Sequence, residues 1–151
     1  MIYADTSVWV SLLTHEARAS DCAAWFAAQP PGAICTGEWT VTEFASALAL
    51  KVRSKQLTSG QADSCWRAFE ALLDGGINLL AASETTHVHA AALCRRYASG
   101  VRAGDAMHLA LAREAGVTAF VTLDALQAKQ AKALRLKVEA IGSAGHRASR
   151  P

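Results

Sequence analysis

The sequence predicts an α/β fold in which a short, mostly parallel sheet carries helices on both faces, forming a three-layer sandwich. Two observations predict this class. Short apolar runs recur along the chain, and longer stretches rich in alanine, the residue that loses least on entering a helix, lie between them. Strands that alternate with helices favour a parallel sheet, which is buried on both faces. The alternation therefore favours this sandwich over a helix bundle or a barrel.

The first elements are a strand over 2–4 and a helix over 6–13, with a hydroxyl at the strand end expected to cap the helix. A second helix over 18–29 stops at Pro30-Pro31-Gly32, because proline cannot continue a helix. The apolar run 33–35 is then the second strand.

The middle of the chain predicts two helices and a strand. A helical pattern runs over about 39–55. Thr58 and Gln61 have the spacing of a capping box, which opens a helix that ends at Gly75-Gly76. The run 77–81 is the third strand.

The last part of the chain follows the same alternation and ends in a tail. We expect one domain over 1–141 and a flexible segment over 142–151. Asp124 and Gln127 have capping-box spacing at the start of the last helix. The expected elements are helices over 85–98 and 103–115, a strand over 119–122, a helix over 124–134 and a final strand over 138–141.

Composition excludes several classes of protein. A chain of 151 residues that is 52% hydrophobic and 19% charged is too apolar for intrinsic disorder and long enough to bury a core. Its longest apolar runs are too short to span a membrane, and its first residues do not have the pattern of a secretory signal, so we expect a cytoplasmic protein. The four cysteines are widely spaced, which is typical of small core residues rather than of disulfides or zinc ligands. The net charge of +2 is too small to identify a nucleic-acid binder.

Two aspartates stand where a parallel sheet binds its ligands, and a third stands near a helix start. The crevice of such a sheet lies at the carboxyl ends of the strands, and Asp5 and Asp124 follow expected strands there. Asp105 stands near the start of the helix over 103–115. Each of the three has a simpler interpretation as a helix cap or as a favourable charge at a helix start. Position alone does not separate the two interpretations.

Glu43 is harder to explain as a structural residue. Its neighbours along the helix face are Trp39, Ala47 and Leu50, and no basic residue lies within helical reach. Such a carboxylate has to pair across the fold, raise its pKa or bind a cation. If the aspartates converge on it, their mutual repulsion favours a hard divalent cation, and Mg²⁺ or Mn²⁺ suits an oxygen-only set of ligands best.

The order of these motifs resembles the PIN-domain ribonucleases, specifically the VapC-type toxins of bacterial toxin-antitoxin pairs. The resemblance covers the chain to about residue 141. Many members have a bulkier residue where Gly104 stands, and this glycine is expected to loosen the helix start that holds Asp105. The stretches that carry the resemblance are Asp5-Thr6-Ser7, Thr42-Glu43-Phe44, Asp105-Ala106-Met107-His108-Leu109-Ala110 and Thr122-Leu123-Asp124.

The resemblance implies hydrolysis of RNA phosphodiester bonds with Mg²⁺ or Mn²⁺. Asp5 and Asp105 would be the principal metal ligands, Glu43 a ligand or a base acting through water, and Asp124 a ligand of a second metal or of a bound water. His108 is expected to hold the helix by hydrogen bonds rather than act as the base. The supporting hydroxyls would be those of Thr6, Ser7 and Thr122, and Arg102 would meet an RNA phosphate or pair with an acid.

The same resemblance implies a VapB-like antitoxin as protein partner, a homodimer, and a structured RNA such as tRNA as substrate. Two other functions stay open. One is a catalytically silent PIN domain that only binds RNA or protein. The other is a magnesium-dependent phosphatase with Asp5 as nucleophile, although Ser7 stands where the dehalogenase-type phosphatases need a second aspartate. The four tryptophans are more typical of a core than of base stacking.

Overall fold

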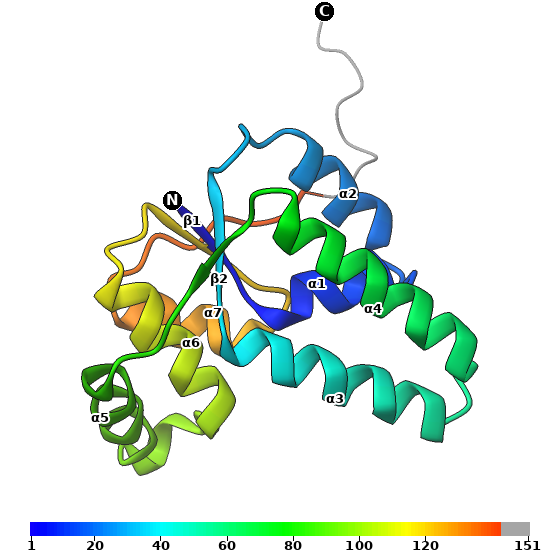
Figure 1. Ribbon diagram of the computed structural model, residues 1–151. Coiled ribbons are helices and arrows are strands. Elements are labelled where there is room, and N and C mark those ends of the chain that lie inside the picture. The colour runs from blue at the N-terminus through cyan, green and yellow to red at the C-terminus, as the bar shows by residue number, and fades with distance from the viewer. Residues whose placement is uncertain (143–151) are drawn as a thin grey trace, which may run out of the picture.

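The computed structural model describes residues 1–142, in which four strands form one parallel sheet with helices on both faces (Figure 1). The strand order is β3-β2-β1-β4, so the first strand lies inside the sheet, between β2 and β4. This is the α/β sandwich that the sequence predicts. The strands are β1 (Ile2–Ala4), β2 (Ile34–Gly37), β3 (Asn78–Leu80) and β4 (Ala119–Val121).

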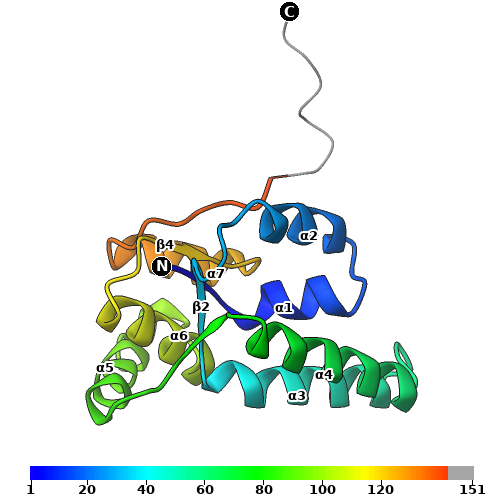
Figure 2. The same ribbon diagram turned by 45° about the horizontal axis from the view of Figure 1, so that its top comes forward.

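Seven α-helices of the described part surround the sheet, with α1 to α4 on one side and α5 and α6 on the other (Figures 1 and 2). A short 3₁₀ helix, Tyr97–Ser99, follows α5. The helices are α1 (Thr6–Leu13), α2 (Ala19–Ala27), α3 (Trp39–Arg53), α4 (Ser59–Asp74), α5 (Glu84–Cys94), α6 (Ala103–Glu114) and α7 (Ala125–Ala133).

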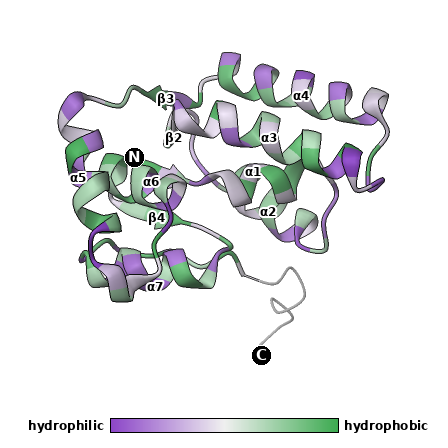
Figure 3. Cartoon of the chain, turned by 90° about the horizontal axis from the view of Figure 1, so that it is seen from below, coloured by the Kyte–Doolittle hydropathy of each residue, from purple (hydrophilic) through white to green (hydrophobic). Residues whose placement is uncertain are grey.

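The sheet separates two hydrophobic cores, because successive residues of a strand point to opposite faces. Ala4 and Val121 pack in the core under α1 to α4, together with aromatic residues of those helices such as Trp9. Tyr3 and Phe120 pack in the other core, which α5, α6 and α7 cover. Burying a large apolar side chain contributes about 1.5–3 kcal/mol, so both faces hold the sheet in place. Figure 3 shows that polar and apolar residues alternate along the outer helices.

Two helix starts differ from the sequence-based expectation. The Thr58 capping box is present as predicted. Asp5 occupies the N-cap position of α1, but no side-chain hydrogen bond caps this helix, so the hydroxyl cap predicted there was wrong. At α7, Asp124 accepts from the backbone N–H of Gln127 as predicted, but the Gln127 side chain turns inward to Thr122 and does not complete a capping box.

The final strand predicted over 138–141 was also wrong. Only Val138 pairs with the sheet, through a single bridge to Phe120. The next residues are drawn toward α2: Glu139 accepts a hydrogen bond from the Trp25 indole at 2.8 Å, and the Ile141 carbonyl accepts one from Arg18 at 2.6 Å. These side-chain contacts end the pairing after one residue.

Three further predictions concern the remaining parts of the chain. Cys22, Cys35 and Cys65 are buried and all four cysteines are free, as expected of core residues. Among the described residues no helix is both long and apolar enough to cross a membrane. Apart from Gly142, the tail expected over 142–151 lies outside the described residues.

Candidate active site

The four predicted acidic residues meet at the carboxyl edge of the sheet. Asp5 directly follows β1, Glu43 lies one turn into α3, Asp105 lies in the first turn of α6, and Asp124 caps α7. All four line one pocket of about 350 Å³. The parallel topology explains this convergence, since strands that run in one direction release their following residues at one edge.

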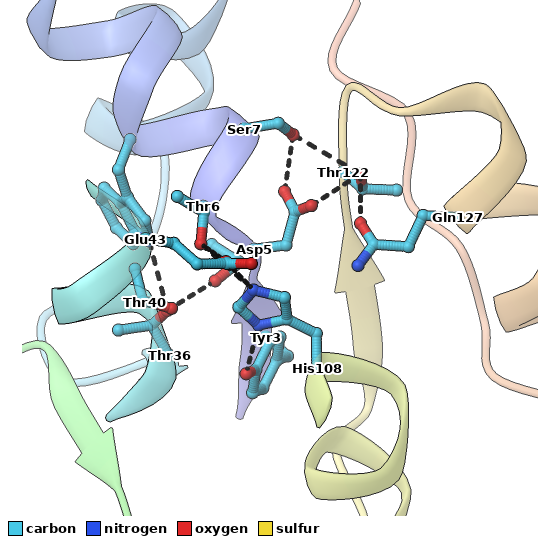
Figure 4. Close-up of polar contacts among 12 residues, drawn as sticks. Tyr3, Asp5, Thr6, Ser7, Thr36, Thr40, Glu43, His108, Thr122 and Gln127 are labelled. Atoms are coloured by element: carbon cyan, nitrogen blue, oxygen red, sulfur yellow. Dashed lines mark hydrogen bonds and ion pairs between the residues drawn. The ribbon is translucent and has the colours of Figure 1, made fainter. Parts of the chain in front are cut away.

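Asp5 lies at the buried end of the pocket, with 4% of its surface exposed. Oδ1 accepts a hydrogen bond from the Ser7 hydroxyl at 2.6 Å, and Oδ2 accepts one from Thr122 at 2.9 Å (Figure 4). Burial raises the pKa of Asp5 to about 6, although His108 and the two hydroxyls act in the opposite direction. The two hydroxyls therefore hold a carboxylate that is costly to keep charged in a metal-free protein.

Thr122 connects Asp5 to the start of α7. Its hydroxyl oxygen accepts from the backbone N–H of Asp124 at 2.9 Å and lies 2.8 Å from the amide oxygen of Gln127. One hydroxyl proton serves only one acceptor at a time, and the charged Asp5 carboxylate is the stronger acceptor. The Gln127 side chain, which is almost fully buried, thus packs directly behind the Thr122–Asp5 contact (Figure 4).

Glu43 pairs across the fold, which is one of the three outcomes that its sequence context allows. The Thr6 hydroxyl donates a short hydrogen bond to Oε2, and His108 Nε2 lies 2.6 Å from the same oxygen. Burial alone would raise its pKa, but His108, Thr6 and the Trp39 indole together lower the pKa of Glu43 below its ordinary value. Glu43 is therefore a carboxylate held in its charged form.

His108 contacts this carboxylate from the buried side. The imidazole has 2% of its surface exposed, and its Nδ1 lies 2.8 Å from the Tyr3 hydroxyl of β1 (Figure 4). The expected hydrogen-bonding role of His108 is present, but its partners are Tyr3, Thr6 and Glu43 of three other elements. The histidine thus connects α6 to the sheet and to α3.

Asp105 and Asp124 form the more accessible side of the pocket. Burial is the main cause that raises the pKa of Asp105; the negative charges of Asp124 and Glu43 add to it, and the backbone N–H of Arg102 opposes it. Asp124 is exposed, and its Oδ1 accepts from the Gln127 N–H at 2.8 Å. The capping interpretation of Asp124 is thus realised without removing it from the pocket.

A second hollow, of about 460 Å³, adjoins the acidic pocket and shares Glu43, Asp105 and Asp124 with it. Arg102, exposed at the N-cap of α6, lines this hollow. It forms no ion pair among the described residues.

Gly104 has a role that the sequence does not reveal. A Cβ atom at this position would collide with Glu43 Oε1 and would lie 3.1 Å from the Trp39 indole nitrogen. The helix still begins at Ala103, so what the glycine visibly provides is room for Glu43 and Trp39. Trp39 is also 40% exposed, so the core environment expected for the tryptophans was wrong for this one.

Sequence reasoning does not identify two of the contacts. Tyr3 stands in an apolar run and is indistinguishable there from an ordinary core residue. Gln127 has a capping-box position that predicts a different contact. Trp39, by contrast, lies four residues before Glu43, and this i, i+4 spacing places it beside Glu43 in the sequence analysis.

The donor chemistry of the pocket fits a hard divalent cation. Its possible ligands are carboxylate oxygens, with hydroxyl groups behind them, which are the ligands that Mg²⁺ and Mn²⁺ prefer. Within residues 1–142, however, no three acidic, histidine or cysteine side chains stand close enough to form a ready-made metal site. Cation binding would therefore require carboxylates that line the pocket to close on the ion.

Comparisons with known proteins agree with this geometry. The family model of the PIN domain matches residues 2–133. No curated protein sequence matches the chain significantly. Solved structures share the fold at low sequence identity, including that of Mycobacterium tuberculosis VapC20, described as a sarcin-ricin loop cleaving toxin, with 20% identity, coverage of 86% of this chain and 95% of the other, and a TM-score of 0.69.

Two toxin-antitoxin complexes are among the similar structures. VapBC-1 of nontypeable Haemophilus influenzae matches at 18% identity over 93% of this chain and 98% of the other, with a TM-score of 0.64. VapBC2 of Rickettsia felis, bound to a DNA fragment from its promoter, matches at 16% identity over the same shares of the two chains, with a TM-score of 0.62. At these identities the likeness establishes the fold alone.

Proposed function

Because the chain belongs to the PIN-domain family, we propose that it is a metal-dependent ribonuclease and the toxin of a toxin-antitoxin pair. One observation carries the proposal: four carboxylates from four separate elements line a single pocket at the carboxyl edge of the sheet. A structural role explains Asp124 as a cap, but it does not explain why Asp5, Glu43 and Asp105 share this pocket. Mutually repelling carboxylates are typical of a site built to hold a cation.

Each carboxylate has a distinct part in this proposal. Asp5 and Asp105 would be the principal ligands, since burial raises the pKa of both and a bound cation would offset the cost of their charge. Glu43, held in its charged form, would accept a proton from a water or bind the cation through one. Asp124, on the exposed side of the pocket, would bind a second metal or a bound water. When bound, Mg²⁺ or Mn²⁺ would supply a water of lowered pKa and stabilise charge on the phosphate.

The hydroxyl groups would orient the ligands. Ser7 and Thr122 each donate to one oxygen of Asp5, and Thr6 donates to Glu43. Outer hydrogen bonds of this kind often change metal affinity by about 10–100-fold when removed. Arg102, on the wall of the adjoining hollow, would bind a backbone phosphate of the RNA.

The similar structures support the proposed RNA substrate and protein partner. VapC20 is described as cleaving the sarcin-ricin loop, which supports a structured RNA as the substrate class, and tRNA is the first candidate to test. The VapBC complexes support a VapB-like antitoxin as partner. A segment of such an antitoxin would cover the acidic pocket, and a homodimer is proposed for the toxin itself.

The two alternative functions account for the pocket less well. A phosphatase that uses Asp5 as nucleophile leaves Glu43 and Asp105 in the pocket unexplained, and Ser7 stands where the dehalogenase-type enzymes need a second aspartate. A silent binding domain has no need for a charged Glu43 held against His108 and Thr6. Both alternatives become outcomes of the experiment below.

The test is cleavage of purified total RNA and tRNA by the full chain with Mg²⁺ or Mn²⁺, with and without a chelator. We expect the wild type to cut and the chelator to stop it. Asp105→Asn should lower the rate at least a hundredfold, because it removes a ligand charge without changing the size of the side chain. Equal behaviour of wild type and variant would mean that the pocket is not a ribonuclease site and would favour a binding role.

A further inference from the structure

We propose that Tyr3 is a positioning residue for the acidic pocket: it fixes the tautomer and rotation of His108, which in turn fixes the carboxylate of Glu43. The inference rests on the proposed function, which it deepens by adding a buried residue of β1 to the machinery. The three side chains form a continuous chain of contacts from the centre of the sheet to the pocket (Figure 4).

The Tyr3 ring is locked in place by its surroundings. It is fully buried and stacks on Phe120 at 5.5 Å between ring centroids, with the two planes 8° apart. Its hydroxyl oxygen lies 2.6 Å from the point where a Cβ of Gly37 would stand, so only a glycine in β2 lets the phenol reach this position. A residue of the core that served packing alone would not need its hydroxyl accommodated in this way.

Counting protons assigns the direction of each hydrogen bond. The phenol has a single proton, and because the side chain is fully buried that proton needs an acceptor within the protein. The acceptor in reach of that proton is His108 Nδ1, at 2.8 Å.

The direction of the second hydrogen bond, between His108 and Glu43, follows from this assignment. If Nδ1 accepts from Tyr3, a neutral imidazole carries its proton on Nε2, which faces Glu43 Oε2 at 2.6 Å. An ionised carboxylate is an acceptor only, so this tautomer is the one that Glu43 needs. Without the Tyr3 hydroxyl the proton could move to Nδ1, and two acceptors would then face each other across the short Nε2–Oε2 distance.

The chain offers a well-matched set of variants. Tyr3→Phe removes the hydroxyl and keeps the ring that stacks on Phe120. Tyr97→Phe is the control, because Tyr97 is the only other tyrosine of the sequence and is 87% exposed. His108→Gln keeps an amide N–H that can reach Glu43 and removes the acceptor that faces Tyr3.

Three readouts test the inference on the full chain. In the metal-free protein, ¹⁵N NMR of the histidine side chains should show His108 protonated on Nε2 in the wild type and in Tyr97→Phe, and a mixture of tautomers in Tyr3→Phe. The dissociation constant for Mn²⁺, measured by calorimetry, should rise about tenfold in Tyr3→Phe. For RNA cleavage, kcat should fall about tenfold while KM changes less than twofold, because binding of the RNA does not involve Tyr3.

A double-mutant cycle separates positioning from mere structural support. If Tyr3 acts through His108, the tenfold effect of Tyr3→Phe on Mn²⁺ binding should fall below twofold in a His108→Gln background. An undiminished effect in that background would overturn the inference. A His108 tautomer and Mn²⁺ affinity unchanged by Tyr3→Phe would overturn it as well, even with full RNA cleavage in the wild type.

A failure of the proposed function would give a different set of results. A wild type that cuts no RNA, but whose His108 tautomer shifts in Tyr3→Phe, would disprove the ribonuclease and leave the positioning role intact. Circular dichroism on each variant shows the folded fraction, to which the binding data are normalised. Should Tyr3→Phe not fold, the tautomer of the wild type alone decides, since protonation of Nδ1 instead of Nε2 contradicts the assignment.

Discussion

At the scale of single residues, Gly104 shows how an absent side chain can serve a site. Replacing a helical glycine by alanine ordinarily stabilises a helix by about 0.5–1 kcal/mol. At Gly104 the added methyl group would displace the Glu43 carboxylate and crowd the Trp39 indole. Glu43 Oε1 is the end of a flexible side chain, so it can move away from the added methyl group. The substitution should therefore shift the Glu43 carboxylate without disturbing the fold.

We therefore predict that Gly104→Ala leaves the free energy of unfolding within about 1 kcal/mol of wild type and lowers RNA cleavage about tenfold to a hundredfold, since small misplacements of a catalytic group have effects of this size. Gly60→Ala is the control: Gly60 is also near the start of a helix, and a Cβ there would meet nothing within 4 Å. Equal activity of the two variants would contradict this view of Gly104.

Asp5 gives a prediction about pH. Its pKa rises from an ordinary value of 3.8 to about 6 on folding, so the folded state resists ionisation of this carboxyl. Because the pKa is higher in the folded state, the part of the stability that is linked to protonation of Asp5 is fully present below pH 3.8 and is lost as the pH rises through about 6. The cost at neutral pH reaches about 3 kcal/mol at most.

Asp5→Asn should consequently stabilise the metal-free protein at pH 8 by up to about 3 kcal/mol and make little difference near pH 4. Urea unfolding of both proteins at the two pH values, with chelator present, measures this difference. An asparagine keeps one acceptor oxygen, and its NH₂ group only donates, so either Ser7 or Thr122 loses its acceptor, which reduces the gain. A variant less stable than wild type at pH 8 would show that the two hydroxyls fully offset the burial of the charge.

The candidate residues themselves could be predicted from the sequence, but their partners could not. Asp5 and Asp124 follow strands, and this position is a local feature that the chain displays directly. The contact of Glu43 with His108 joins residues 65 positions apart, and that of Tyr3 with His108 joins residues 105 positions apart. Such pairs depend on how the strands are ordered, which no local pattern contains.

At the scale of elements, local chemistry predicts helix starts and stops well where backbone capping decides them. Thr58 and Gln61 form the predicted box, and α4 ends before Gly75-Gly76. Prediction failed where a side chain has a stronger tertiary partner: Gln127 turns to Thr122, and Glu139 turns to Trp25. The final apolar run therefore forms one bridge in place of a strand.

The capping box of α4 lies on a helix that contributes no residue to the acidic pocket, so its loss should affect stability alone. Thr58→Ala removes the hydroxyl that accepts from the Gln61 N–H and should lower the free energy of unfolding by about 1 kcal/mol. Urea denaturation measures this loss. RNA cleavage below the unfolding transition should stay within twofold of wild type; a larger fall would mean that α4 is coupled to the pocket.

At the scale of the whole molecule, the strand order β3-β2-β1-β4 explains why the pocket lies where it does. The chain moves outward from β1 to β2 and β3, and then returns to the other side of β1 to form β4. Asp5 and Asp124, 119 positions apart, therefore follow neighbouring strands. The alternation of strands and helices predicts the layers from sequence, but the choice of neighbours comes from packing across the whole chain.

The whole molecule should also respond to a cation before any RNA is added. A ligand that binds only the folded state stabilises it by about 2.7 kcal/mol at a hundred times its dissociation constant. For a chain of this length that corresponds to a rise in Tm of about 5–10 °C. Scanning calorimetry of the metal-free wild type with and without Mn²⁺ measures it, and Ca²⁺ serves as a comparison of cation size.

The Asp105→Asn variant separates two effects of the carboxylates on Tm, their mutual repulsion and their binding of the cation. Removing one negative charge relieves repulsion from Asp124 and Glu43, so the Tm of the metal-free variant should be equal to or above that of wild type. The same change removes a ligand, so the rise caused by Mn²⁺ should largely disappear. A variant that keeps the full rise in Tm would place the cation elsewhere on the protein, and the four carboxylates would then owe their meeting at the sheet edge to something other than a metal.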